Sequence, residues 1–560
     1  MNKVPVYALV LLFFAQTPVF CGPSAEYTES VPVPFTRGVN FGGWFEYLPK
    51  TPQEVSNKFT EQDFMDAKNM GYDAIRLPVD FMLFTSGVPG YKIDPLLFKL
   101  IDQAVDLAEK HQLYIILDCH PEAQPEIHRS IRNFLIPVWS QIAEHFKNRS
   151  DYLIYEILNE PQAISARDWG KIQGDVVDEI RKIDKKHLIV VGGTDYNSVE
   201  TLSSLPKYKD NRLLYTFHFY EPLVFTHQGS GDLEDLEGVP FPYRSGSMPA
   251  IPNDLKGTWA EKVIANYTYR GNGEETARLI KKASDFSKQR NVPVFCGEFG
   301  VLMRFAAADD RVRWYQTVRE QFEANKIPWI NWAYYDCFGL FNSQLDGIFT
   351  WLSIGDINHD LNVDLVKALG LKAPSQRQRE QVKTGFTIYD DEFGRGILTF
   401  YREENTINMY HTPAAEGQYS IHLGDLRRKG ERWDGLTLLF SIVDLTYLVR
   451  NGYVLEFKAK REKPFTFNVT FSNLRNGINW DNGFTVDQRH VPADGKWYTV
   501  RIPLADMHAW DGRDIVSDEY VNSPGARNAS WDKINVMNFL MTQEGGGAYD
   551  LYLDSIKITK

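Results

Sequence analysis

Residues 153–161 read Leu-Ile-Tyr-Glu-Ile-Leu-Asn-Glu-Pro, an apolar run that ends abruptly in a polar pair. Residues 153–158 have the length and composition of a β-strand buried on both faces, the pattern typical of parallel sheets. Asn159 and Glu160 follow at once, so an amide and a carboxylate stand where the strand ends. Chemistry in α/β folds is found at the carboxyl ends of such strands. This stretch therefore predicts both a parallel sheet and a site at its edge.

The same pattern recurs along the first two thirds of the chain. We expect eight strands, at residues 39–42, 74–78, 114–119, 153–158, 188–191, 214–219, 292–297 and 329–333. Amphipathic helices separate them, and the clearest spans residues 94–111, with Asp94 as the N-cap and Pro95 at the first helical position. Eight strand-then-helix units predict an α/β fold, a (β/α)8 TIM barrel over residues 30–372. A doubly wound open sheet is the alternative, but no glycine-rich phosphate-binding fingerprint follows the first strand.

Composition limits the classes of function. The chain has 560 residues with 61 Lys and Arg against 73 Asp and Glu, which gives a net charge of −12. Hydrophobic residues at 43% and charged residues at 24% are ordinary for a globular protein and exclude a multi-span membrane protein. An acidic chain without a basic run has no general attraction for phosphate backbones. We therefore expect no nucleic acid partner.

The first residues have the features of an export signal. Lys3 supplies a positive start, residues 6–14 are almost all apolar, and residues 18–22 hold a breaker and small residues suited to cleavage. About nine apolar residues are too few to span roughly 30 Å of hydrocarbon. We predict a signal peptide at residues 1–22 and a secreted or cell-surface protein. Lipid modification at Cys21 is an alternative, although Phe20 is large for the position before such a cysteine.

Polar and aromatic residues collect where the predicted strands end. They are Arg76 in the second strand, His120 after the third, Asn159 and Glu160 after the fourth, His218 and Tyr220 at the sixth, Glu298 at the seventh and Trp332 in the eighth. Taken singly, each has an ordinary structural role: Arg76 could form a surface ion pair, and Trp332 could simply pack. Six strands ending in this way are harder to explain as packing, because unpaired buried polar groups are costly.

Two of these residues are carboxylates, and the pair indicates the chemistry. Hydrolysis of a glycosidic bond needs one carboxylic acid to protonate the leaving oxygen and a second carboxylate on the other side of the sugar. Glu160 and Glu298 are the candidates, because strands four and seven of a closed barrel can direct side chains into one cleft. The paired Cys and His patterns of metal sites are missing, so we expect no cofactor and no metal. Cys119, Cys296 and Cys337 lie in apolar segments and are expected to be buried thiols.

The ordered set of motifs resembles glycoside hydrolase family 5, the cellulase family of clan A. The motifs are Gly38-Val39-Asn40-Phe41-Gly42-Gly43-Trp44, Arg76-Leu77-Pro78, Leu117-Asp118-Cys119-His120, Leu158-Asn159-Glu160-Pro161, His218-Phe219-Tyr220, Gly297-Glu298-Phe299-Gly300 and Asn331-Trp332. The resemblance implies that Glu160 is the general acid/base and Glu298 the nucleophile of a retaining double displacement. It further implies that Arg76, Asn159, His218 and Tyr220 position the two carboxylates. His120 and Trp332 would bind the sugar.

The resemblance leaves the substrate open. The segment at residues 221–229 is similar to endo-β-1,4-glucanase members of the family, and this favours β-1,4-glucan such as cellulose or mixed-linkage β-glucan. A β-mannanase or a β-1,3-glucanase is the alternative within the family, and a non-catalytic glycan-binding protein is the alternative outside it. Trp44 and Trp259 could add sugar-stacking positions or simply pack. We expect the chain to be a monomer.

The chain changes character near residue 373. Residues 373–384 are polar and predict a linker, and short alternating strands replace the long helices after it. Residues 385–560 predict an all-β jelly-roll sandwich that resembles carbohydrate-binding modules. Trp433, Trp480, Trp510 and Trp531 are candidates for a sugar platform in this unit. Asp391 and Asp554 are candidate ligands of a structural calcium ion.

Overall fold

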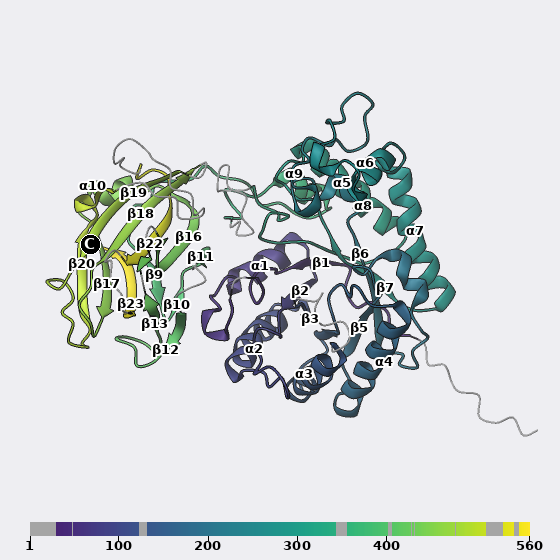
Figure 1. Cartoon of the computed structure of the whole chain (residues 1–560), viewed down its shortest axis with the longest axis horizontal. Helices are drawn as coiled ribbons and strands as arrows, with labels where there is room; N and C mark the ends of the chain where they lie inside the picture. Colours follow the sequence, from purple (N-terminus) through teal and green to yellow (C-terminus); the bar gives the residue numbers. More distant parts are fainter. Residues whose placement is uncertain are drawn as a thin grey trace, which may run out of the picture.

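A computed structural model describes residues 30–560, except 48, 122–130, 343–354, 401–405, 427, 430–431, 476–477, 511–529 and 542–547. The chain forms two units that lie side by side, a barrel in its first part and a β-sandwich in its second (Figure 1). None of the helices in the described ranges is long and apolar enough to cross a membrane.

The first unit is a closed barrel of eight parallel strands, which confirms the predicted (β/α)8 architecture. The strands are β1 (Arg37–Asn40), β2 (Ala74–Val79), β3 (Tyr114–Cys119), β4 (Leu153–Glu156), β5 (Leu188–Gly192), β6 (Leu213–Phe219), β7 (Val294–Phe299) and β8 (Trp329–Asn331). Each strand pairs with the next along the chain, and β8 pairs with β1 to close the ring. The carboxyl ends of all eight strands therefore meet at one end of the barrel.

Helices surround the barrel. They are α1 (Glu61–Met70), α2 (Pro95–Lys110), α3 (Ile131–Phe146), α4 (Ala166–Ile183), α5 (Leu223–Thr226), α6 (Trp259–Arg270), α7 (Gly273–Arg290), α8 (Ala308–Ala324) and α9 (Val363–Ala368), with 3-10 turns η1 (Pro52–Glu54), η3 (Val199–Ser204), η4 (Gly231–Leu233) and η5 (Asn253–Leu255). Helix α2 matches its predicted signals, since the Asp94 side chain accepts a hydrogen bond from the Leu96 amide and Pro95 opens the helix. Its apolar positions, among them Leu97, Ile101 and Ala104, are buried against the barrel.

The second unit consists of two packed antiparallel sheets, as predicted for an all-β sandwich. Its elements are β9 (Phe386–Asp390), β10 (Glu392–Phe393), β11 (Ile397–Phe400), β12 (Thr406–His411), β13 (Ser420–Leu426), β14 (Arg428–Lys429), β15 (Arg432–Trp433), β16 (Gly435–Val443), α10 (Thr446–Arg450), β17 (Val454–Lys460), β18 (Phe467–Arg475), β19 (Ile478–Val486), β20 (Tyr498–Pro503), η6 (Leu504–Asp506), β21 (His508–Trp510), β22 (Ile534–Met541) and β23 (Tyr549–Thr559). One sheet runs β10-β9-β23-β13-β12, with β17 and β20 attached through β23, and the other runs β11-β16-β22-β18-β19-β21. A separate apolar core fills the space between the sheets.

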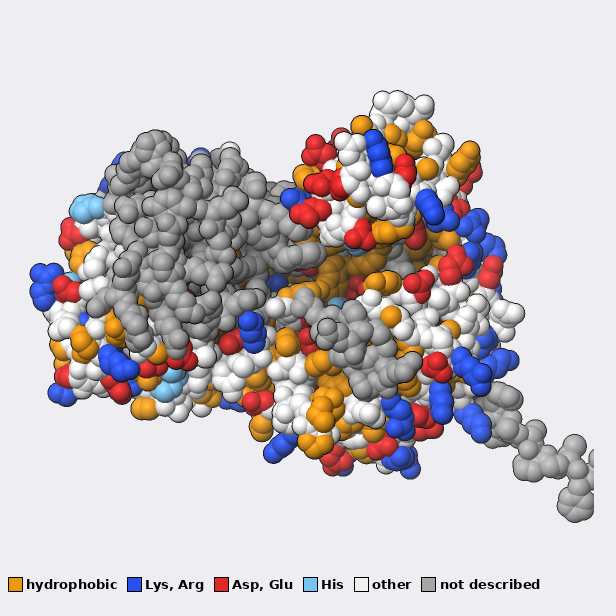
Figure 2. Space-filling view, in the orientation of Figure 1, with side chains coloured by type: hydrophobic (Ala, Val, Ile, Leu, Met, Phe, Trp, Pro, Cys, Tyr) orange, Lys and Arg blue, Asp and Glu red, His pale blue; other side chains and the backbone are white. Residues whose placement is uncertain are grey.

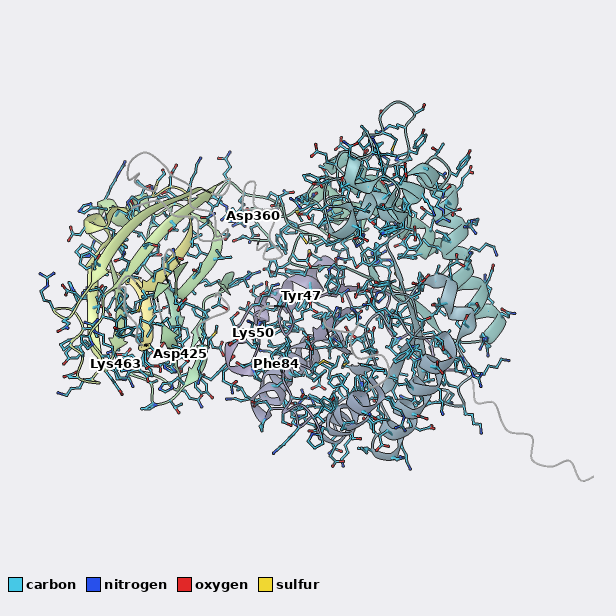
Figure 3. The ribbon with its side chains drawn as sticks, viewed as in Figure 1. Tyr47, Lys50, Phe84, Asp360, Asp425 and Lys463 are labelled. Carbon is cyan, nitrogen blue, oxygen red and sulfur yellow. The ribbon has the colours of Figure 1, made fainter. Side chains whose placement is uncertain are left out.

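The segment at residues 373–384 forms neither helix nor strand, but it is hydrogen-bonded to both units. On the barrel side, the Gln376 side chain donates to the Ile357 carbonyl at 2.8 Å, and Arg379 pairs with Asp360 (labelled in Figure 3). On the sandwich side, Arg379 also donates to the Ile442 carbonyl at 2.7 Å. This predicted linker therefore fastens one unit to the other.

The two units also touch directly. Arg395 of the sandwich reaches α1, where its guanidinium lies 2.5 Å from Asp66 and 3.3 Å from Asp63. Lys99 of α2 donates to the Tyr419 hydroxyl at 2.6 Å. In Figure 3, the labelled Tyr47 and Lys50 mark the side of the barrel that faces the sandwich. The sandwich is thus docked on the barrel through specific polar contacts.

Candidate active site

The predicted site residues gather at the carboxyl ends of the barrel strands. The space-filling view shows a hollow on the barrel with apolar side chains along it, bordered by the lobe that carries α5 and α6 (Figure 2). The Arg76 side chain from β2 lies at the centre of the polar network and is completely buried. A buried guanidinium needs several acceptors, because each unpaired N–H group would cost free energy.

Arg76 finds these acceptors on the neighbouring strands. Its guanidinium contacts Glu156 of β4 at 2.8 and 2.9 Å and Asp118 of β3 at 2.9 Å. It also donates to the Asn159 side chain at 3.0 Å and to Glu298 at 2.6 Å. One cation thus holds residues from three other strands or their ends, which fixes the floor of the site.

Glu298, in β7, accepts hydrogen bonds on both carboxylate oxygens. Arg76 Nη1 donates to Oε1, and the Tyr220 hydroxyl donates to Oε2 at 2.8 Å. The Glu298 side chain is buried. Burial of Tyr220 and the nearby Glu298 carboxyl group raise the pKa of Tyr220 well above its usual range. The Tyr220 hydroxyl therefore keeps its proton and remains a donor. These two donors hold both oxygens of the Glu298 carboxyl group in place.

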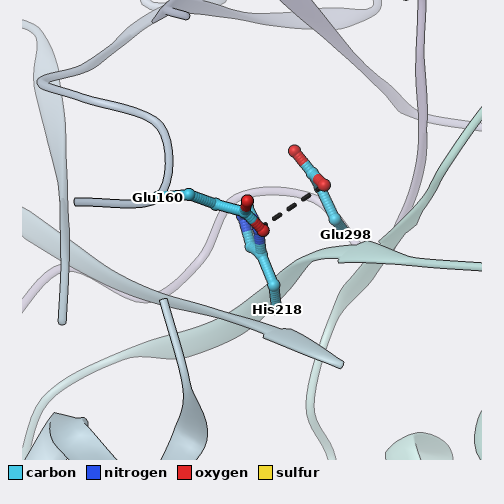
Figure 4. A group of neighbouring side chains, drawn as sticks. All are labelled: Glu160, His218 and Glu298. Atoms are coloured by element: carbon cyan, nitrogen blue, oxygen red, sulfur yellow. Dashed lines mark hydrogen bonds and ion pairs between the residues drawn. The ribbon is translucent and has the colours of Figure 1, made fainter. Parts of the chain in front are cut away.

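Glu160 faces Glu298 across His218 (Figure 4). His218 Nδ1 lies 2.7 Å from Glu160 Oε1 and 3.5 Å from Glu298 Oε2. One carboxylate oxygen of Glu160, one of Glu298 and a ring nitrogen of His218 all lie within 4.8 Å of one another. Glu160 itself has a positive φ of 43°, a conformation that is rare outside glycine and is concentrated at functional sites.

The protonation of this group is set by burial and by an excess of carboxylates. Burial raises the pKa of Glu160 to about 8, Glu156 adds to the effect, and Arg76 opposes it. Burial lowers the pKa of His218 to about 4 and that of His120 to about 3, so both imidazoles are neutral at neutral pH. At neutral pH, Glu160 is therefore a protonated acid with a neutral imidazole at its oxygen.

His120 and Trp332 line the site next to this group. His120 Nδ1 lies 2.8 Å from Asp118, and the Asn159 side chain lies 2.9 Å from His120 Nε2. The Trp332 ring stacks on His120, with 5.7 Å between ring centroids. The structure thus brings all eight predicted site residues into one connected cluster.

Sequence reasoning missed two carboxylates of the network, Asp118 and Glu156. Burial raises the pKa of Asp118 to about 7, and it raises that of Glu156 as well, while Arg76 opposes both shifts. The signal was present in the sequence, because each is a single acidic residue inside an otherwise apolar strand. Asn197 was missed too; its amide lies 3.4 Å from His218 Nε2.

The remaining sequence predictions have mixed outcomes. The cysteines Cys119, Cys296 and Cys337 are buried and free, as expected. Trp44 is buried, whereas Trp259 is 44% exposed and donates to Asp232. The signal peptide and Cys21 lie outside the described residues.

The candidate sites of the sandwich are only partly described. The side chains of Trp433, Trp480 and Trp510 lie outside the described residues. Trp531 packs against the core, with its ring 5.8 Å from that of Phe471. The two acidic candidates hold a turn: Asp391 accepts from the amides of residues 418 and 419, and Asp554 from those of 415 and 416.

A closed (β/α)8 barrel with two facing carboxylates at its strand ends is an arrangement characteristic of glycoside hydrolases. Residues 38–337 match the model of Cellulase (glycosyl hydrolase family 5), and residues 382–560 match that of carbohydrate binding domain 30. The first match spans more than half of the chain. The chain therefore belongs to glycoside hydrolase family 5, the cellulase family.

Individual relatives are distant. Endoglucanase 3 of Fibrobacter succinogenes is 27% identical over 347 residues, which cover 57% of this chain and 52% of that protein, so the chain spans about half of this relative. Endoglucanase C of Acetivibrio thermocellus is 28% identical over 320 residues, 54% of this chain and 92% of the relative. Among solved structures, cellulose synthase subunit Z of Clostridioides difficile is 28% identical, covers 60% of this chain and 99% of that chain, and has a TM-score of 0.47.

Proposed function

We propose that the protein is a retaining endo-β-1,4-glucanase in which Glu298 is the nucleophile and Glu160 the general acid/base. The observation that carries this proposal is the close approach of two carboxyl groups in unlike surroundings, with oxygens within 4.8 Å of each other. Retaining glycosidases hold their carboxyl groups about 5–5.5 Å apart, whereas inverting enzymes leave about 6.5–9.5 Å for a water molecule.

In the first step, a carboxylate oxygen of Glu298 attacks the anomeric carbon, and the bond from that carbon to the leaving oxygen breaks. Glu160 donates its proton to the leaving oxygen as the bond breaks. Arg76 and Tyr220 donate hydrogen bonds to the two oxygens of Glu298 and orient it toward the sugar before the attack. The product of this step is a glycosyl ester of Glu298.

In the second step, Glu160 acts as a base. It takes a proton from a water molecule, and that water attacks the same carbon and releases Glu298 as a carboxylate. His218 stays against Glu160 in both steps and keeps its oxygen oriented. His120 and the Trp332 ring form the apolar side of the cleft, where a sugar face can pack.

β-1,4-Glucan is the substrate that the sequence favours. Residues 221–229 resemble a segment of endo-β-1,4-glucanases, and relatives such as Endoglucanase C are named as endoglucanases. We further propose that the sandwich binds the same polysaccharide, that residues 1–22 direct export, and that the chain acts as a monomer. Recovery of the mature chain from outside the cell, with its N-terminus determined, tests the export proposal.

The function is tested by product release from carboxymethyl-cellulose, mixed-linkage β-glucan, glucomannan and laminarin, with Glu298→Gln as the control. We expect cleavage of the β-1,4-glucans by the wild type and a loss of at least about a thousandfold in the variant. The variant should still bind oligosaccharides, because Gln has nearly the same volume as Glu.

The anomeric form of the first product distinguishes the mechanisms. Retention, observed by NMR within minutes of cleavage, is expected. Inversion would remove the role of Glu298 as nucleophile. Cleavage of mannan or laminarin alone would keep the catalytic roles and change the substrate, and no cleavage at all would favour a binding-only protein.

A further inference from the structure

Four residues, Val55 to Lys58, lie between the sandwich and the wall of the active site. They follow η1 and precede α1, and we refer to them as the bridge segment. Val55 and Lys58 are almost completely buried. Successive residues of the segment bind to different units of the molecule.

Val55 and Asn57 face the sandwich. The Tyr410 hydroxyl of β12 donates to the Val55 carbonyl at 2.8 Å, and the Asn57 side chain donates to Glu392 of β10 at 3.2 Å. A cavity of about 270 Å³ lies at this interface, lined from both units by residues that include Val55, Asn57 and Tyr410. Because this part of the interface is hollow, these hydrogen bonds are important in holding the segment.

Ser56 and Lys58 bind the loop that follows β1. The Trp44 indole donates to the Ser56 carbonyl at 2.9 Å, and Lys58 Nζ donates to the Gly42 carbonyl at 2.8 Å. Burial lowers the pKa of Lys58 to about 8, although the carboxyls of Asp336 and Glu46 oppose the shift. The bridge segment thereby fixes the loop that follows β1.

The loop after β1 supports a residue of the site. A Cβ placed on Gly42 would lie 3.3 Å from the Trp332 ring, so the Gly42 backbone is packed against that ring. Trp332 in turn stacks on His120. A continuous chain of contacts therefore leads from Tyr410 in the sandwich, through Val55 and Lys58, to the side chains proposed to bind the sugar.

We infer that the sandwich positions the sugar-binding wall of the active site through the bridge segment, and that Tyr410 is a positioning residue of the barrel's reaction. The effect on activity rests on the function proposed above. The sandwich accordingly acts on the cleavage of short soluble substrates as well as on polymer binding.

Two tyrosines of the sandwich provide a matched test in the full-length protein. Tyr410→Phe removes the hydrogen bond to the bridge segment. Tyr419→Phe removes the interdomain hydrogen bond that Lys99 of α2 donates to the Tyr419 hydroxyl. The centroid of the Tyr419 ring lies only 5.4 Å from that of the Tyr410 ring. Both variants lose one hydroxyl at the same interface, but only the first acts on residues 55–58.

We expect Tyr410→Phe to lower kcat/KM on cellopentaose by about three- to tenfold, mainly through KM, because the bridge segment that supports the wall loses one hydrogen bond. Tyr419→Phe should stay within about twofold of the wild type. Thermal midpoints of the two variants should be similar, so a merely structural effect would be equal in both. Equal losses of kcat/KM, or no loss in Tyr410→Phe, would overturn the inference.

Hydrogen exchange provides a readout that is independent of activity. The amide of Gly43 is held by Glu46 at 2.7 Å, and a peptide covering residues 38–46 reports on this loop. Faster exchange of this peptide is expected in Tyr410→Phe and not in Tyr419→Phe, and unchanged exchange in both would contradict the coupling. If the wild type cleaves no glucan, the proposed function fails while exchange still decides the inference.

Discussion

At the residue scale, the site is defined by one cation shared among several carboxylates. Arg76 contacts Asp118, Glu156 and Glu298 directly. Glu160 interacts electrostatically with the same positive charge. One positive charge cannot neutralise four carboxylates in a buried place, so protonation is favoured where no strong donor is bound. Glu298 has two strong donors, whereas Glu160 has the neutral imidazole of His218 at its oxygen. This difference supports the roles proposed above, with Glu298 as the nucleophile and Glu160 as the acid.

The pH dependence of activity follows from this separation. The pKa of Glu160 is raised to about 8, so the acid is present below that pH and is lost as the pH rises through it. We expect kcat/KM on cellopentaose to fall about tenfold per pH unit above about 8. A dinitrophenyl cellobioside, whose leaving group needs no proton, should not show this decline. An identical alkaline limb for both substrates would argue against Glu160 as the acid.

At the element scale, the sequence predicted the bounds of a strand well where the flanking residues mark its ends clearly. β3 spans residues 114–119 as predicted: a turn at residues 111–112 precedes its apolar run, and the polar His120 follows it. β7 begins two residues later than predicted. The Val292 amide donates back to the Ser287 carbonyl at the end of α7, and Pro293 has no N–H, so neither residue donates a hydrogen bond to a neighbouring strand.

Most of the site residues could be predicted because they stand at or near a strand end, and the order of strands in a barrel brings those ends together; Arg76, inside β2, was recognised as a charged residue within an apolar strand. The supporting residues could not be predicted in this way. Lys58 and Asn197 lie in connecting segments, and their contacts to Gly42 and His218 depend on the tertiary fold. Nothing in the local sequence distinguishes them from surface residues.

Helix capping makes a prediction at this scale. α2 has a capped start, whereas α8 begins after Ala307, which offers no side-chain cap. Asp94→Ala should destabilise the barrel by about 1 kcal/mol, because the Leu96 amide loses its acceptor. Ala307→Ser should stabilise it by up to about 1 kcal/mol by supplying one. Urea unfolding midpoints measure both changes, and shifts in the same direction would contradict the capping argument.

At the scale of the whole molecule, the docking of the two units is the feature that the sequence concealed. Residues 373–384 have the composition of a flexible linker, yet Arg379 ties them to both units. The direct contacts join residues more than 300 positions apart, such as Arg395 and Asp66. Such pairs depend on the three-dimensional meeting of two surfaces, which no local pattern encodes.

Arg395 provides the last prediction. Its side chain is 36% exposed, but its partners Asp63 and Asp66 are only 1% and 11% exposed, and Asp63 also accepts a hydrogen bond from Tyr335 at 2.8 Å. Arg395→Gln should therefore destabilise the protein by about 1–2 kcal/mol, because two largely buried carboxylates lose their cation.

Arg501→Gln is the matched control, since Arg501 pairs with Glu456 within the sandwich and is half exposed. It should change the free energy of unfolding by less than about 0.5 kcal/mol. Adding Asp66→Asn to Arg395→Gln should recover part of the loss, because the uncompensated charge is removed. If Arg395→Gln costs no more than Arg501→Gln, the ion pair with α1 does not hold the units together, and docking must rest on the other contacts between them, those of Lys99 with Tyr419, of the bridge segment and of residues 373–384.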